Sequence, residues 1–311
     1  MATGDVVLGE NQYGKAECRL VRVDRGVSTG STSGKHRITD LTVTSQLRGD
    51  FAACHTHGDN SQVVATDTQK NTVYAFARDG IGAPEELLLR LAEHFTTGFP
   101  WVDGGRWEAQ QHSWDRIEVG GEPHDHSFVR TGRETRTTLV QRDGDEVFVL
   151  AGLRDLTVLK STGSEFAGFP RDRYTTLPET DDRILATDVT AWWRYAELPP
   201  GSDGSNGFDA TYAAVRDLLL ETFADLHSLA LQQTIFAMGK AVLEAFPGIA
   251  EVRLSCPNNH HFLVDLAPFG LDNPGEVFLA ADRPYGLIQA TVQREGEARE
   301  PRAWATVAGF A

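Results

Sequence analysis

Apolar and polar residues alternate in the first part of the chain, as they do in strands that bury one face. The pattern is clear in LTVTSQL at 41–47, where every second side chain is apolar or small. The preceding GVSTGSTSGKH at 26–36 is typical of a flexible hairpin connection back to CRLVRV at 18–23. Two strands are therefore expected to open the chain.

Helical spacing follows these strands. TDTQKNTVYAFARDG at 66–80 predicts a short helix with Asp67 as its cap. PEELLLRLAEHF at 84–95 predicts a second helix, because its large apolar residues fall on one face behind an initial proline.

The second half of the chain repeats this order after the β-like runs at 106–142. It contains β-like patterns at 155–169 and 183–196, apolar helical stripes at 208–223 and 231–246, and β-like patterns at 251–266 and 286–294. Strand, strand, helix, helix, strand, strand thus occurs twice. We predict an α+β fold with an internal duplication, residues 1–150 and 151–311. Antiparallel units of this kind leave sheet edges that oligomerisation would pair.

Composition narrows the functional classes. The 311 residues are 41% hydrophobic and 23% charged, which is ordinary for a globular protein, and the net charge of -15 argues against binding to nucleic acid or to an anionic membrane surface. No apolar run approaches the roughly 20 residues that cross a bilayer, and MATGDVVLGEN is unlike a signal peptide. A soluble intracellular protein is expected. Three cysteines without a CxxC pair indicate neither a disulfide framework nor a structural zinc site.

Polar residues interrupt the apolar pattern of one late strand, SCPNNHHFLVDL at 255–266. With unbroken alternation, Asn258 and His260 continue the face of the apolar residues before them, whereas Asn259 and His261 point the other way. Pro257 is expected to introduce a bulge that could shift this count. A polar turn at a strand end is the simpler interpretation of this segment alone, and a polar pair aimed into a pocket is the sharper one.

Other candidate residues are ambiguous by themselves. The His-x-His pairs His55/His57 and His124/His126 could bind a metal, but they are expected in solvent-exposed loops. Arg183 lies between acidic residues and the next strand, so it is either a surface ion pair or an anion clamp. Nothing local marks Lys15 or Gln232. The chain lacks GxGxxG, P-loop and GxSxG motifs.

Several segments together closely resemble the urate oxidase (uricase) family, and they are spread over almost the whole chain. They are YGK at 13–15, VATDTQKNT at 64–72, PHDHSF at 123–128, LTVLKSTGSEFAGF at 156–169, RDRYTTLPETDDRILATDV at 171–189, FDATYA at 208–213 and PNNHHF at 257–262. The resemblance implies the tunnelling fold (T-fold), in which each chain carries two ββααββ units and a homotetramer closes the sheets into a barrel.

The resemblance also assigns site residues at a subunit interface. Arg183 and Gln232 would grip urate, Phe166 would stack on it, and the backbone at Leu231 would contact it. Lys15, Thr66 and Asp67 would come from the neighbouring chain. The resemblance further implies a proton relay of Lys15, Thr66 and His260, with Asn258 at the dioxygen or water site.

The family reaction oxidises urate with dioxygen and water to 5-hydroxyisourate and hydrogen peroxide, without a metal or an organic cofactor. Because free lysine has a pKa of about 10.4, a basic role for Lys15 would require desolvation or nearby positive charge. The chain ends in VAGFA instead of an S-K-L type peroxisomal signal, so a bacterial cytoplasmic enzyme is expected. Two alternatives stay open: a purine- or pterin-handling hydrolase with zinc on Cys54, His55 and His57, and a non-catalytic purine-binding module.

Overall fold

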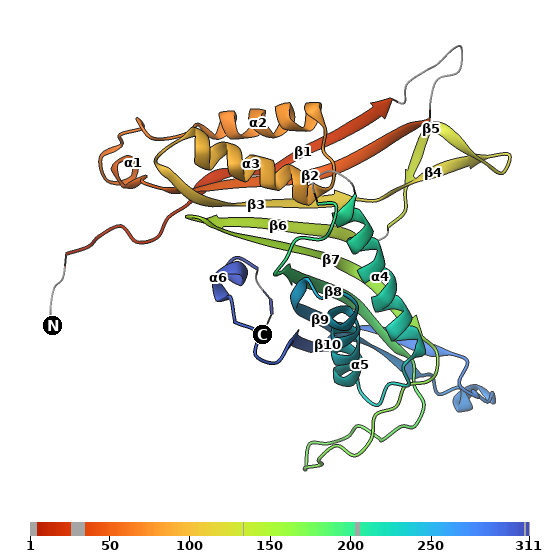
Figure 1. The fold of residues 1–311 in the computed structure, drawn as a ribbon. Coiled ribbons are helices and arrows are strands. Elements are labelled where there is room, and N and C mark those ends of the chain that lie inside the picture. The colour runs from red at the N-terminus through yellow and green to blue at the C-terminus, as the bar shows by residue number, and fades with distance from the viewer. Residues whose placement is uncertain (1–4, 26–34, 133, 203–205, 308, 311) are drawn as a thin grey trace. The chain divides into compact units, whose positions relative to one another are not determined.

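The computed structural model describes residues 5–25, 35–132, 134–202, 206–307 and 309–310. The chain forms two compact units, the first made of residues 1–151 and 198–209 and the second of residues 152–197 and 210–311. Each unit combines helices with antiparallel strands (Figure 1), so the predicted α+β class is confirmed at this level. The boundary near residue 150 concerns an internal duplication and stays a prediction.

The first unit packs helices on one sheet. Its elements are β1 (Tyr13–Arg25), β2 (His36–Gly49), α1 (Ala52–His57), α2 (Thr66–Asp79), α3 (Pro84–Gly98), β3 (Val102–His112), β4 (Trp114–Val119), β5 (Glu122–Arg130), β6 (Thr135–Asp143) and the start of β7 (Glu146–Lys160). The strand order is β1-β2-β3-β6-β7, while β4 and β5 form a separate two-stranded sheet. Figure 1 shows α2 and α3 along this sheet, and they contact β1 and β3 respectively.

The predicted patterns of this unit are confirmed where periodicity was strong. The alternating residues of β2, from Leu41 to Leu47, are fully buried, and so are Leu88 and Phe95 on the inner face of α3. The cap predicted at Asp67 is wrong, because α2 begins at Thr66 with Ala65 as N-cap and no capping side chain. The predicted connection at 26–36 lies mostly outside the described residues.

The second unit repeats the combination of a sheet with covering helices. It contains the rest of β7, β8 (Leu185–Tyr195), α5 (Leu231–Ala245), β9 (Ile249–Leu263), the short helix η1 (Ala267–Phe269), β10 (Phe278–Gln293) and α6 (Pro301–Trp304). α4 (Gly207–Asp225) starts at the end of the first unit's residues and continues in the second. The strand order is β7-β8-β9-β10, and α5 packs on β9 and β10.

A loop replaces part of one predicted strand in the second unit. β7 ends at Lys160, and residues 161–169 make only isolated bridges, Ser164 with Ser228 and Phe166 with Thr180. Gly163 and Gly168 adopt positive φ angles of 72° and 75°, which end the extended backbone.

β9 keeps its register across Pro257. Against β8, Thr190 pairs with Ser255 and Thr187 pairs with Asn258, so equal numbers of residues separate the pairs on both strands. The bulge predicted at Pro257 is wrong, because the irregularity lies in β10, between Ala281 and Gly286. The polar turn is also ruled out, since pairing with β10 continues to Leu263.

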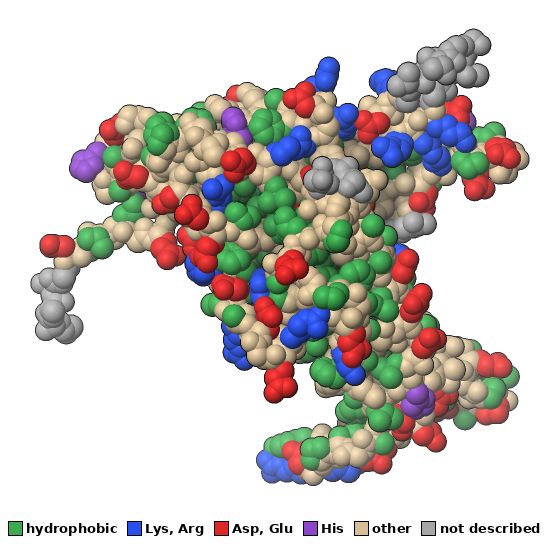
Figure 2. All heavy atoms as spheres, viewed as in Figure 1, with side chains coloured by type: hydrophobic (Ala, Val, Ile, Leu, Met, Phe, Trp, Pro, Cys, Tyr) green, Lys and Arg blue, Asp and Glu red, His purple; other side chains and the backbone are tan. Residues whose placement is uncertain are grey.

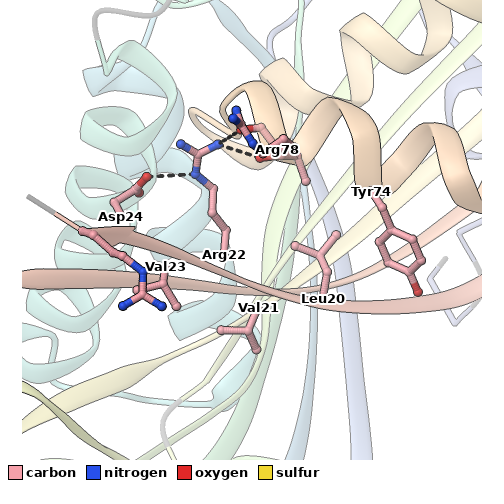
Figure 3. Close-up of a pocket in the computed structure, with 9 residues that line it drawn as sticks. Leu20, Val21, Arg22, Val23, Asp24, Tyr74 and Arg78 are labelled. Carbon is pink, nitrogen blue, oxygen red and sulfur yellow. Dashed lines mark hydrogen bonds and ion pairs between the residues drawn. The ribbon is translucent and has the colours of Figure 1, made fainter.

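A groove of about 500 Å³ runs along β1, the edge strand of the first unit, beside α2 (Figure 3). Arg22 lies at the C-terminal end of α2, where its Nη1 donates to the carbonyls of Ala77 at 2.6 Å and Arg78 at 2.9 Å. A cation at these carbonyls satisfies groups that a helix C-terminus leaves without partners. On the opposite strand face, Val21 is 54% exposed.

Acidic side chains are scattered over the visible face of the molecule (Figure 2), in keeping with the net charge of -15. Within the described residues, none of the helices has the length and apolar character needed to cross a bilayer.

A buried ion pair ties α3 to the sheet in the first unit. Glu85, in the first turn of α3, is fully buried and accepts hydrogen bonds from Arg136 at 2.7 Å and from Thr138 at 3.2 Å. Arg136 also contacts Asp209 at 2.5 Å. Removing one member of such a group leaves a charge buried without full compensation.

Glu85→Ala is therefore expected to lower the free energy of unfolding by about 3 to 5 kcal/mol. Glu93→Ala is the matched control, because Glu93 pairs with Arg142 at 2.9 Å from the same helix but is 66% exposed; its cost is expected to be at most about 1 kcal/mol. Urea denaturation at one fixed protein concentration measures both, and equal costs would contradict the importance of the buried group.

The three cysteines differ in accessibility. Burial raises the pKa of Cys256 to about 12, and it also raises the pKa of the buried Cys18. Both thiols are thus protonated at pH 8, whereas the reactive form is the thiolate. Cys54 is half-buried.

We expect a maleimide at pH 8 to modify only Cys54 in the native protein and all three cysteines in urea, as measured by mass spectrometry. Cys54→Ser should abolish native labelling. Labelling of Cys256 as fast as that of Cys54 would show that β9 is not packed as described.

Candidate active site

A cavity of about 560 Å³ opens in the second unit. Its size is typical of pockets for small molecules. Six of the residues assigned from the family resemblance line it together: Phe166, Arg183, Leu231, Gln232, Asn258 and His260.

Arg183 presents a guanidinium without a carboxylate partner among the described residues. The side chain is half-buried, its Nε donates to Ser164 Oγ at 3.3 Å, and its backbone N–H donates to Ser164 O at 2.8 Å. Burial lowers its pKa from the ordinary value, although an arginine stays charged. Of the two interpretations from sequence, the geometry supports the anion clamp, because the neighbouring Asp182 instead accepts from Thr162 at 2.9 Å.

Phe166 supplies an aromatic wall next to this cation. Arg183 Cζ lies 5.4 Å from the centroid of the Phe166 ring. A pair of backbone hydrogen bonds with Thr180, of 2.9 and 3.1 Å, holds the phenylalanine in place, and its ring stacks on Phe169 at 5.1 Å. A flat ring beside a guanidinium suits a planar anionic ligand.

The N-terminus of α5 forms a further part of the wall. Leu231 and Gln232 are its first two residues, and the N-cap, Ala230, has no side chain that could accept from them. The first backbone hydrogen bond of the helix reaches Thr234, so the N–H groups before it have no partner within α5. These N–H groups can donate to a ligand, and the amide of the exposed Gln232 can both donate and accept.

β9 contributes the polar pair predicted from alternation. Asn258 and His260 follow the fully buried Cys256 on the same face and line the cavity. Asn259 points away and donates to Asp188 at 2.8 Å. His261 also reaches the cavity, against the alternation predicted from the sequence, and its Nδ1 lies 3.1 Å from the carbonyl oxygen of Asn259.

Lys15, Thr66 and Asp67 lie in the first unit. Thr66 and Asp67 are the first two residues of α2, which, like α5, starts after an alanine without a side-chain cap. Lys70 is the main cause of a lowered pKa of Asp67, by hydrogen bonding and charge, and Lys15 contributes a smaller effect.

A bulge in β1 follows Lys15 directly. Between Lys15 and Cys18, β1 carries one more residue than β2, and Glu17 has a positive φ of 56°. Bulges of this kind re-aim side chains and are common beside active sites.

The suggested metal ligands do not form a cluster. His55 and His57 lie in α1, and His124 and His126 lie in β5, so their prediction as loop residues is wrong. In the part of the chain that the structure describes, no three His, Cys, Asp or Glu side chains are arranged to hold a metal ion.

Sequence reasoning missed the buried hydroxyls behind the cavity. Ser164, Ser228 and Thr234 are fully buried in the second unit. Ser164 lies in a segment predicted as a strand, and Ser228 lies between two predicted helical stripes, so no pattern marks either serine as a buried polar residue. Apolar lining residues were missed as well, among them Ile184 and Ile288.

Comparison with known proteins supports the family resemblance. The chain matches the family model described as Uricase over residues 11–141 and 149–289. A uricase of Arthrobacter globiformis is 62% identical over 305 residues, which cover 98% of this chain and 96% of the relative. A uricase of Aspergillus flavus is 38% identical and covers 91% of this chain and 95% of the relative.

Solved structures agree with these relatives. The crystal structure of uricase from Arthrobacter globiformis matches with a TM-score of 0.90 at 61% identity, covering 97% of this chain and 100% of that chain. A uricase from Bacillus fastidious matches with a TM-score of 0.78 at 27% identity, covering 96% and 97%. The resemblance predicted from the motifs is confirmed, and the chain belongs to the uricase family of enzymes.

Proposed function

We propose that the chain is a urate oxidase, which converts urate, dioxygen and water into 5-hydroxyisourate and hydrogen peroxide. The observation that carries this proposal is the Arg183 guanidinium, which has no carboxylate partner among the described residues and lies beside the Phe166 ring. This arrangement suits a flat anion with adjacent acceptors, and urate is such an anion at neutral pH.

The proposed binding mode follows from the chemistry of the lining groups. Arg183 donates to one edge of urate, while the Gln232 amide donates and accepts along another edge. Phe166 stacks on the ring, and the backbone N–H at Leu231 adds a donor. Thr66 and the N–H of Asp67 reach the same ligand from a neighbouring chain.

The proposed reaction needs proton transfer before electron transfer. Lys15, Thr66 and His260 form a relay that takes a further proton from bound urate, and the dianion gives electrons to dioxygen beside Asn258. A peroxide forms at a ring carbon and leaves as hydrogen peroxide, and water adds to complete 5-hydroxyisourate. The substrate itself supplies the electrons, so we propose no metal and no organic cofactor.

We also propose the quaternary arrangement implied by the family. Residues 1–150 and 151–311 form two tandem T-fold units, and four chains pair their sheet edges into a barrel. β1 is an edge of the first unit and β10 is an edge of the second, and unpaired edges favour association. The cytoplasmic location stays a prediction.

Purified protein is expected to consume urate, measured by loss of its ultraviolet absorbance, and to release an equal amount of hydrogen peroxide in the presence of EDTA. Abolition of turnover by the chelator, together with stoichiometric zinc in the purified protein, would favour the metal-dependent hydrolase. Urate binding without consumption would favour the purine-binding module.

Mixing two inactive variants tests the shared site. Lys15→Met and Arg183→Gln are each expected to lose most activity, because each removes one half of every site. Co-expressed at equal levels, they should recover about a quarter of the wild-type rate, since random two-fold pairing makes one site in four intact. Sites built within one chain would show no recovery, and Arg173→Gln, on an exposed loop of the second unit, is the control for a general loss of arginine charge.

A further inference from the structure

Three buried hydroxyls form a small polar cluster behind the cavity wall. Ser164, Ser228 and Thr234 are each 0% exposed. Thr234 Oγ1 donates to Ser228 Oγ at 2.8 Å. The segments of the two serines are joined by backbone bonds, from Glu165 N to Ser228 O at 2.8 Å and from Ser228 N to Gly163 O at 2.9 Å.

One side of this cluster holds Arg183. Ser164 accepts twice from that residue, through its hydroxyl from Nε at 3.3 Å and through its carbonyl from the backbone N–H at 2.8 Å. Because Nε already has a partner, the two terminal nitrogens of the guanidinium are the ones that face a ligand. Ser164 therefore determines which edge of the planar guanidinium faces a ligand.

The other side of the cluster holds the start of α5. Thr234 is the fourth residue of the helix, about one turn beyond Leu231. Gln233 strengthens the same junction, since its Oε1 accepts from Leu229 N at 2.8 Å. These hydrogen bonds thus connect the segment of Ser164, which holds Arg183, with the first turn of α5, which carries Gln232.

We propose that Ser164, Ser228 and Thr234 are positioning residues, which set the spacing and orientation of the Arg183 guanidinium relative to the first turn of α5. This inference rests on the proposed function, because the clamp has a task only if both groups bind one ligand. Ser164 holds Arg183 through a neutral hydroxyl and a carbonyl and so leaves the guanidinium charge for an anion, whereas a carboxylate in the place of Ser164 would compete with it.

Urate binding without oxygen tests the role of Ser164, because urate is not consumed under these conditions. Ser164→Ala is expected to weaken urate binding about fivefold to tenfold, the effect of losing one hydrogen bond that orients a charged donor. In an Arg183→Lys background the same change should have almost no effect, because lysine has no Nε for the serine to hold. Ser164→Cys keeps the shape of the side chain but offers only a weak acceptor, so it is expected to behave like Ser164→Ala.

Thr162→Val is the matched control, since Thr162 bonds the neighbouring Asp182 in the same loop but is exposed. It should bind urate within about twofold of the wild type. In air, Ser164→Ala should raise KM with little change in kcat, as expected when only binding is affected.

Two results would overturn the inference: unchanged urate affinity in both Ser164 variants, or an equal loss in the wild-type and Arg183→Lys backgrounds. The second result would make Ser164 a purely structural residue. Failure of the proposed function is separate, because the wild-type protein would then not consume urate in air, whatever the effect of the Ser164 variants on binding.

Discussion

The unbroken register of β9 is the constraint on which the candidate site depends. Successive side chains of a strand point to opposite faces. The insertion of one residue therefore moves every following side chain to the other face. An insertion at Pro257 would therefore exchange Asn258 and His260 for their neighbours. The pairing with β8 shows no such insertion, and the irregularity lies in β10 instead, between Ala281 and Gly286. β9 can thus place polar side chains in a cavity wall while its earlier residues remain in the core.

The two units surround an arginine side chain with different partners. Arg136 lies between the carboxylates of Glu85 and Asp209, and Thr138 completes the hydrogen bonding of Glu85. The charges of this group compensate each other, so removing one of them is costly. Arg183 is supported by neutral oxygens of Ser164, so its charge is left for a ligand. The difference in partners, more than the difference in burial, separates a structural arginine from a binding one.

In both units, candidate site residues lie at the start of a helix that lacks a capping side chain. Both α2 and α5 begin after an alanine that cannot cap, and each presents its first N–H groups beside a residue assigned from the family resemblance. A serine or aspartate at either N-cap would stabilise the helix but would occupy one of these donors. Strand irregularities accompany the same positions, at Lys15 in β1 and opposite His260 in β10. An uncapped helix start and an irregular strand are less stable than regular elements, but they leave polar groups available for binding.

The strong periodicities determined the elements of the fold without tertiary information. β2, α3 and α5 appear where their apolar residues recur, because burial of one face is a property of local spacing. The alternation in 251–266 likewise identified Asn258 and His260 as residues of one face, and the motifs were specific enough to predict the family. The ends of elements were less predictable: Asp67 does not cap α2, and residues 161–169 are not a strand, since caps and glycine turns depend on a few atoms.

Only the tertiary structure decided which polar residues serve the site. Nothing near Ser164 in the chain distinguishes it from an exposed loop serine, and it meets Arg183 only because two loops and the start of α5 pack together. The burial of Glu85 could not be predicted from the sequence either. A glutamate in the first turn of a helix is usually exposed, and its partner Arg136 is 51 residues away. Sequence by itself determined the elements and the family, because both are written in local spacing and motifs. The partners of each charge were decided by packing, because hydrogen bonds and desolvation act between groups that are near in space and distant in the chain.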